Sequence, residues 1–172
     1  MVDVALCLGT NSGDRREYMR CMEDMVCGLL VPPICSSPLM ETEPVDVDDI
    51  QPWYFNRIIG GSYNGGAFGL LASCKKIERT LGRQEKGNRR QRTADIDILF
   101  FGSEVIDTDE LTVPHPAILS RRFCLEGLSR IMPNAIIGEP PARICDWYRA
   151  MNQMIRTQKL RFLDPEGGHS DN

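Results

Sequence analysis

Residues 90–101 read RQRTADIDILFF, and the character of this run decides the fold. The β-branched and aromatic side chains that follow Asp95 are typical of a strand. Successive side chains of a strand point to opposite faces, so Asp95 and Asp97 share one face while Ile96 and Ile98 share the other. The rise per residue places the two carboxylates about 7 Å apart. Two unpaired carboxylates in a core are costly, so we expect a buried arginine or a divalent metal between them.

The size and charge of the chain indicate one globular domain. With 172 residues, 42% hydrophobic and 26% charged, it is long enough for one sizeable core. The net charge of −4 argues against a general nucleic-acid binder, which needs a basic face. No apolar run approaches the roughly 18 residues of a spanning helix. The start MVDVALCLG lacks the features of a signal peptide, so we expect a cytoplasmic protein without membrane contact.

The seven cysteines are best interpreted as free thiols. Their number is odd and no pair has CxxC spacing, so we expect buried thiols in a reducing compartment. The two histidines, His115 and His169, are not near a cysteine pair, which argues against a zinc site.

Hydrophobic periodicity predicts alternating strands and helices. Strands are expected at 2–8, 34–42 and 53–63, and helices at 15–30, 67–81 and 121–132. Pro32 and Pro33 are expected to end the first helix, and Gly82 to cap the second. Together with the strand that carries the two aspartates, the order predicts an α+β fold. Its sheet is expected to be antiparallel and ferredoxin-like, with helices on its faces in an α/β/α sandwich.

The end of the chain leaves two alternatives open. Apolar residues between 144 and 155 suggest one helix, which either packs on the domain or contacts another subunit. We therefore expect a monomer, with a dimer through this helix as the alternative. Residues 1–160 are interpreted as a single domain, and 161–172 as a frayed tail.

The basic loop before the two aspartates indicates phosphate chemistry. A D-x-D pair alone is also compatible with two solvated aspartates at a strand edge. The pair offers the oxygen ligands that Mg²⁺ prefers, and arginines suit phosphate oxygens. Together they indicate phosphoryl transfer through positioning and charge neutralisation. No GxxxxGK[ST] or GxGxxG sequence is present, which argues against a P-loop or a Rossmann site.

Four segments in order resemble a known enzyme family. They are ALCLGTNSGDR, SSPLMETEPV followed by QPWYFN, RTADIDILFFG, and LTVPHPAILSRRFCLEGL. The chain resembles the 6-hydroxymethyl-7,8-dihydropterin pyrophosphokinases over roughly residues 2–137. The resemblance implies Mg²⁺-dependent transfer of pyrophosphate from ATP to the pterin alcohol, giving AMP and the pterin diphosphate, a step in folate biosynthesis.

The resemblance also implies a role for each matching residue. Asp95 and Asp97 would bind two Mg²⁺ ions, and Arg83 and Arg92 would neutralise phosphate charge in catalysis. The residues expected around the pterin are Thr42, Pro44, Val45, Tyr54, Asn56 and Phe123. The residues expected to contact ATP are Glu78, Ile98, Thr112, His115 and Arg121. From the residues alone, Tyr54 could instead be a core aromatic, His115 a structural hydrogen-bonding group and Glu78 a surface acid.

Two alternative functions stay open, and the sequence differs from the family pattern at one place. Another two-metal nucleotidyltransferase is an alternative, although its usual Gly-Ser helix start lies close to the acid pair, and here GTN is distant. A non-catalytic ferredoxin-like binding module is the other alternative. Arg89, Arg90 and Gln91 replace the aromatic and small residues that the family usually has before its signature arginine. We therefore expect weaker closure over the pterin with intact phosphate chemistry.

Overall fold

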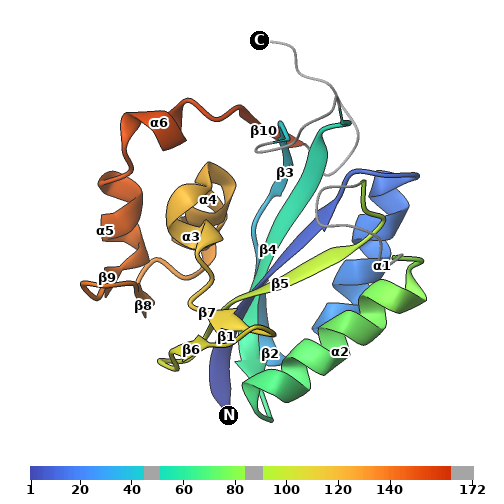
Figure 1. Ribbon diagram of the computed structural model, residues 1–172, viewed down its shortest axis with the longest axis horizontal. Helices are drawn as coiled ribbons and strands as arrows, with labels where there is room; N and C mark the ends of the chain where they lie inside the picture. The colour runs from blue at the N-terminus through green and yellow to red at the C-terminus, as the bar shows by residue number, and fades with distance from the viewer. Residues whose placement is uncertain (45–50, 84–90, 164–172) are drawn as a thin grey trace.

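A computed structural model describes residues 1–44, 51–83 and 91–163 of the chain. Within them, six strands form one sheet in the order β10-β3-β4-β1-β5, with β2 also paired to β4, and every pairing is antiparallel. Figure 1 shows the sheet edge-on between two groups of helices. The strands are β1 (Val2–Thr10), β2 (Val31–Ser36), β3 (Leu39–Thr42), β4 (Tyr54–Tyr63), β5 (Asp95–Phe101) and β10 (Leu160–Leu163).

The predicted strand at 34–42 is in fact two strands that share one edge of β4. β3 pairs with the first residues of β4 and β2 with later ones. Between them, the backbone N–H of Ser37 donates to Ile58 O at 2.9 Å, and Ser37 Oγ accepts from Ile58 N at 3.0 Å. Pro38 follows and has no N–H for a ladder, which explains the interruption.

The expected end of the first helix was also wrong. α1 (Arg15–Cys27) ends before the prolines, with Gly28 as its C-cap, and both prolines lie in β2. β2 has a strand partner on one side only, and an edge position tolerates proline. At its start, α1 is capped by Asp14, whose side chain accepts from Glu17 N at 3.1 Å.

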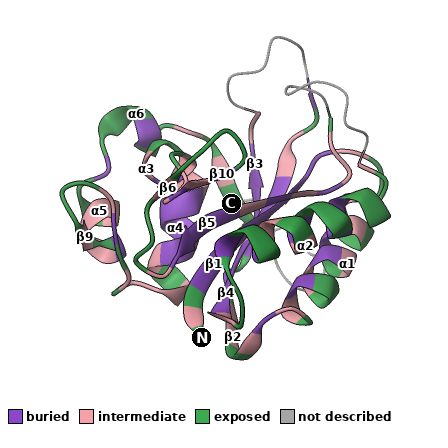
Figure 2. Cartoon of the chain, turned by 60° about the horizontal axis from the view of Figure 1, so that its bottom comes forward, coloured by how far each residue is buried: buried purple, intermediate pink, exposed green. Residues whose placement is uncertain are grey.

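One face of the sheet is covered by α1 and α2 (Ala67–Thr80). Met22, Val26 and Leu70 are fully buried there against Leu6 and Leu8 of β1. Figure 2 shows the outward sides of both helices as exposed and the central strands as buried. This amphipathic pattern is the one that the 3.6-residue period predicts.

The other face carries four short helices and a second core. The helices are α3 (Ala117–Ser120), α4 (Arg122–Ile131), α5 (Ile144–Arg149) and α6 (Gln153–Arg156). Leu125 and Leu128 of α4 pack against Ala5 and Ile58 of the sheet. The single helix expected across 144–155 is two helices, because Asn152 adopts an extended backbone and caps α6 through Ile155 N at 3.0 Å.

The chain after α6 returns to the sheet. Residues 161–163, assigned above to a frayed tail, are part of β10, which pairs with β3 over four residues. The small hairpins β6 (Ile106–Asp107) with β7 (Thr112–Val113), and β8 (Ile136–Ile137) with β9 (Ala142–Arg143), connect the larger elements. Across the described ranges, no helix has the length and apolar character needed to cross a bilayer.

All seven cysteines are free thiols, as expected. Only Cys7, Cys74 and Cys124 are fully buried, so the expectation of burial holds for these three.

Candidate active site

β5 presents Asp95 and Asp97 on the side of the sheet that faces α4. Their partners on β1 are Gly9 and Cys7, and Cys7 belongs to the core beneath α4. The predicted alternation is confirmed: Ile96 and Ile98 are buried in the opposite core, beneath α1 and α2.

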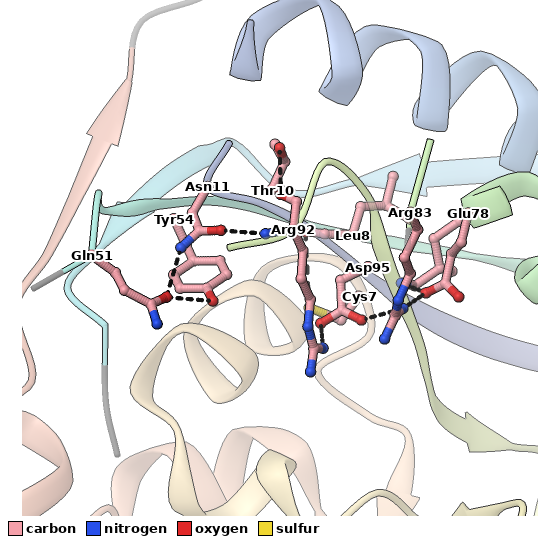
Figure 3. A network of polar contacts seen from close by, with 11 residues as sticks. Cys7, Leu8, Thr10, Asn11, Gln51, Tyr54, Glu78, Arg83, Arg92 and Asp95 are labelled. Carbon is pink, nitrogen blue, oxygen red and sulfur yellow. Dashed lines mark hydrogen bonds and ion pairs between the residues drawn. The ribbon is translucent and has the colours of Figure 1, made fainter. Parts of the chain in front are cut away.

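Two arginines flank the Asp95 carboxylate (Figure 3). Arg83 Nη1 donates to Asp95 Oδ1 at 2.6 Å, and Arg92 Nη1 donates to Asp95 Oδ2 at 2.5 Å. All three side chains are partly exposed, between 17% and 27%. Of the two partners expected for the acid pair, a buried arginine or a divalent metal, arginine contacts Asp95. Charge-assisted bonds of this kind fix the direction of both guanidinium groups.

Glu78 of α2 contacts both Arg83 and strand β5. Its Oε1 accepts from Ile96 N at 2.8 Å and also from Arg83 Nη1. Burial is the main cause that raises the pKa of this carboxyl, while the bond from Ile96 and the charge of Arg83 oppose it. The alternative of a surface acid does not hold, because the side chain is 9% exposed. Glu78 links helix α2, Arg83 and strand β5 at one point.

Asp97 differs from Asp95 in having no cation directly on it. No hydrogen bond or ion pair among the described residues reaches its carboxylate. Burial, followed by the negative charge of Asp95, raises the pKa of Asp97 to about 7. An acidic group in this setting is stabilised by any cation that arrives beside it.

The donor set of this acid pair fits Mg²⁺. The described residues contain no group of three or more His, Cys, Asp or Glu side chains that could hold a metal alone. Mg²⁺ commonly binds to one or two carboxylates and takes its other ligands from water and substrate phosphates. Two carboxylates on one strand face, one of them without a cationic partner, meet that requirement.

The buried Asn11, to which no role was assigned from the sequence, connects Arg92 to Gln51. Asn11 Oδ1 accepts from Arg92 N at 2.8 Å, and Asn11 Nδ2 donates to Gln51 Oε1 at 3.1 Å. Tyr54 Oη in turn donates to Gln51 Oε1 at 3.5 Å. Both Asn11 and Gln51 lie in segments that carry the family resemblance, and that is the signal that could have found them.

Residues expected around a pterin lie on the same sheet face as the acid pair, across β1 from Asp95. Asn56 of β4 donates from Nδ2 to Thr42 Oγ1 of β3 at 2.8 Å, and both are buried. Tyr54 lies on the same side of β4, and Phe123 of α4 packs against the core on this face of the sheet. Pro44 is half-buried beyond the end of β3, and Val45 lies outside the described residues.

Gly9 of β1 lies between Asn56 and Asp95 and has no side chain. On β1 it lies opposite Asn56 on one side and Asp95 on the other. A Cβ at this position would lie 3.2 Å from Asn56 Oδ1 and 3.8 Å from the Cβ of Asp95. The absence of a side chain at Gly9 therefore avoids a close contact with Asn56 Oδ1 and leaves the amide and Asp95 as neighbours across β1.

His115 and Arg121 lie on the α3 side of the acid pair. His115 Nδ1 accepts from Ala117 N at 3.0 Å, and burial followed by the charge of Arg121 lowers the pKa of the imidazole. The ring is thus neutral at pH 7, with its proton on Nε2. The exposed Arg121 separates α3 from α4 in an extended conformation.

The two remaining residues expected to contact ATP are placed less directly. Thr112 lies in β7, where its hydroxyl donates to Asp107 Oδ1 at 3.5 Å. The Ile98 side chain is 2% exposed and faces the opposite core. A nucleotide contact from Ile98 therefore has to come from its main chain, on the strand that ends the sheet. The altered basic residues Arg89 and Arg90 lie outside the described residues.

Comparison with known proteins identifies the family. The family described as 7,8-dihydro-6-hydroxymethylpterin-pyrophosphokinase (HPPK) matches residues 5–133, most of the chain. This chain belongs to the HPPK family. The acid pair, both flanking arginines and the Asn56–Thr42 pair all lie within the matched range.

Named relatives support the assignment to the HPPK family. The chain is 36% identical over 129 residues to the 2-amino-4-hydroxy-6-hydroxymethyldihydropteridine pyrophosphokinase of Bacillus subtilis, covering 73% of this chain and 75% of that protein. It is 41% identical over 131 residues to a folate synthesis bifunctional protein of Arabidopsis thaliana. This chain spans 26% of that bifunctional protein, so it corresponds to one part of it.

Solved structures show the same fold. A crystal structure of Plasmodium falciparum HPPK-DHPS with pteroate has a TM-score of 0.67 and 14% identity, covering 87% of this chain and 44% of that one. A second, described as HPPK-DHPS in complex with substrates, also has a TM-score of 0.67, at 13% identity. At this level of identity, the likeness shows the arrangement of the sheet and helices alone.

Proposed function

We propose that the chain transfers the pyrophosphoryl group of ATP to 6-hydroxymethyl-7,8-dihydropterin with the aid of Mg²⁺, giving AMP and the pterin diphosphate in folate biosynthesis. The observation that carries the proposal is that Gly9 lies between Asn56 and Asp95 on one sheet face, so the amide and the carboxylate are cross-strand neighbours of the same residue. A hydrogen-bonding amide for a heterocycle and a carboxylate for a metal are thereby neighbours. The named relatives support the same chemistry.

At the phosphate end, the two arginines would exchange partners. Each now neutralises Asp95. The phosphates of ATP carry more negative charge than one carboxylate, so they compete for Arg83 and Arg92 and free Asp95 to act as a ligand. Glu78 remains behind Arg83 and keeps it near the reacting phosphate. Two bound Mg²⁺ ions, held by Asp95 and Asp97, would stabilise the charge on the attacking and leaving oxygens.

At the pterin end, the orientation of Asn56 is already determined. Its Nδ2 is used by Thr42, so its Oδ1, which accepts no hydrogen bond from the described residues, lies on the side of Gly9. A carbonyl oxygen suits the amino and ring N–H donors of a pterin. Tyr54 and Phe123 would provide aromatic contact to the flat ring, and Pro44 and Val45 the adjoining backbone.

The ATP-contacting residues would surround the acid pair from the α3 side. Neutral His115 offers a proton on Nε2 to a phosphate oxygen, and Arg121 adds a positive charge beside it. Glu78, Thr112 and the main chain of Ile98 would complete the nucleotide contacts. Positioning of the nucleotide and neutralisation of its charge are the main contributions expected from such groups.

The topology and organisation of the chain fit this assignment. The order of β5, β1, β4 and then β2 with β3 is that of two split β-α-β units, which supports a ferredoxin-like arrangement. We infer that the chain through the end of β10, at residue 163, acts as a single domain, in a monomer located in the cytoplasm. No nucleic-acid partner is proposed, because the chain carries a net charge of −4.

Ion-exchange analysis of the nucleotide products tests the proposal directly. Wild-type protein with ATP and 6-hydroxymethyl-7,8-dihydropterin should form AMP only when MgCl₂ is present, and Asp97→Asn should abolish that product. Asp24→Asn, at an exposed acid of α1, is the matched control and should keep full activity. ADP in place of AMP would contradict pyrophosphoryl transfer. No product from folded protein that still binds ATP would favour the non-catalytic module.

A further inference from the structure

A glutamine near the end of the described chain joins the two helices on either side of Arg121. Gln158 Oε1 accepts from Arg122 N at 2.8 Å, and Gln158 Nε2 donates to Ser120 O at 3.0 Å. Ser120 is the last residue of α3 and Arg122 the first of α4. One amide group therefore spans both sides of Arg121.

This bridge satisfies groups that the two helices leave open. The first N–H groups and the last C=O groups of a helix have no partner within it. Arg121 is the N-cap of α4 but provides no side-chain cap, and its backbone is extended. Gln158 supplies the side-chain acceptor that the N-cap residue does not, and the bond restrains the backbone conformation at Arg121.

The neighbouring Arg122 also contacts the segment that carries Gln158. Its Nη1 donates to Arg156 O and to Gln158 O, both at 3.2 Å. After burial, the charge of Arg121 is the second cause that lowers the pKa of His115, a residue expected to contact ATP. Gln158 therefore holds the backbone on both sides of Arg121.

The residues that follow Gln158 are bonded to β3, the strand that carries Thr42, and to Glu43 after it. Lys159 N donates to Glu43 Oε1 at 3.0 Å, and Leu160 pairs with Thr42 in the β10–β3 ladder. Arg161 then pairs with the buried Glu41 at 2.5 Å. The residues after Gln158 are therefore bonded to Glu43 and β3, while its side chain bonds to the first residue of α4, the helix that carries Phe123.

From this connection, we infer that Gln158 is a positioning residue that sets Arg121 and Phe123 relative to the sheet. The inference rests on the proposed function for the ligands that these two residues contact. Gln158 lies outside the family match, which ends at residue 133. Its side chain bonds to the backbone of Ser120 and Arg122, not to a residue expected to contact a substrate. Any effect on binding would therefore act through Arg121 and Phe123.

Gln158→Met tests the inference, because it keeps the length of the side chain and removes both polar atoms. Gln153→Met is the matched control, since Gln153 is exposed on α6 and its side chain has no hydrogen bond among the described residues. Val26→Ala, in the core on the opposite face, is a second control for lowered stability alone. The measurements are the Kd of α,β-methylene-ATP with MgCl₂, the Kd of 6-hydroxymethyl-7,8-dihydropterin, the melting temperature, and hydrogen exchange over residues 117–125.

The expected result separates positioning from stability. Gln158→Met should raise both Kd values about tenfold and speed exchange across 117–125, since two hydrogen bonds at the junction are lost. Val26→Ala should lower the melting temperature with both Kd values unchanged. Exchange that is unaltered in Gln158→Met, or altered exchange with wild-type Kd values, would overturn the inference. Wild-type protein that binds neither ligand would contradict the proposed function instead, while the exchange comparison still tests the junction.

Discussion

Arg83, three residues after the end of α2, donates a hydrogen bond to Asp95, the first residue of β5, at 2.6 Å. Arg92 holds the other oxygen of the same carboxylate. The expected catalytic arginines and the first expected metal ligand are therefore paired with one another. Binding of Mg²⁺ and ATP would have to replace these pairs, and this exchange makes several predictions specific.

Replacing Arg92 by lysine should lower kcat by about a hundredfold or more, because a lysine cannot present a planar fork to a phosphate. The melting temperature should change little, since the ammonium group can still neutralise Asp95. Steady-state kinetics with both substrates provide the measurement. Arg20→Lys, at an exposed arginine on α1, is the control and should leave kcat unchanged. Wild-type kcat in Arg92→Lys would mean that Arg92 is a structural partner of Asp95 only.

Replacing Gly9 by alanine should weaken pterin binding more than ATP binding. The added Cβ would lie 3.2 Å from Asn56 Oδ1, the acceptor assigned to the pterin, and overfilling costs about 1–3 kcal/mol. We expect a rise of about tenfold in the KM for the pterin. Gly66→Ala is the matched control, since nothing lies within 4 Å of its Cβ position. A rise confined to the KM for ATP would place the pterin elsewhere.

Replacing Thr42 by valine should weaken pterin binding through Asn56. The change keeps the shape of the side chain and removes the acceptor of Asn56 Nδ2, leaving a buried donor at a cost of about 1–3 kcal/mol. The amide then has no fixed orientation, so the Kd of the pterin should rise about tenfold. Isothermal titration measures the Kd, and urea unfolding the stability.

Thr80→Val controls for loss of a hydroxyl, because the exposed Thr80 hydroxyl donates to Lys76 O of its own helix and bonds to no other described residue. Both variants should fold, and only Thr42→Val should change the Kd. Equal affinity in Thr42→Val and wild type would show that Asn56 does not need this partner to present its oxygen.

Local patterns in the sequence were enough to predict the main elements and the acid pair. Alternation alone placed Asp95 and Asp97 on one face, since a strand with one buried side has only one workable register. The α1 and α2 faces followed from helical spacing in the same way. The roles expected for single residues came from the family resemblance, and they remain predictions.

Contacts between distant segments could not be predicted in this way. The four residues of β10 are too short a run to indicate a strand, and they become one because β3 supplies a partner more than a hundred positions earlier. Asn11 also joins residues far apart in the chain, 81 positions from Arg92 and 40 from Gln51. The bridge made by Gln158 depends on where α3 and α4 meet, which no periodicity records.

Stability of the metal-free protein should depend on pH through Asp97. Burial raises the folded-state pKa of Asp97 to about 7, against 3.8 for an unperturbed aspartate. Below about pH 4 the group is protonated in both states and has no effect. As pH rises from about 4 to about 7, the unfolded state loses its proton first, so unfolding becomes more favourable. Wild-type stability should therefore fall across this window by a few kcal/mol, at about 1.4 kcal/mol per pKa unit.

Asp97→Asn removes this dependence and should be more stable than wild type at pH 8, by about 2–4 kcal/mol, while matching it near pH 4. Urea unfolding in EDTA at several pH values measures the difference. Asp24→Asn removes an exposed carboxylate from α1 and controls for the change in net charge. A constant difference between Asp97→Asn and wild type from pH 4 to pH 8 would mean that Asp97 ionises like an ordinary surface acid. In that case, the site would not need an arriving cation to relieve it.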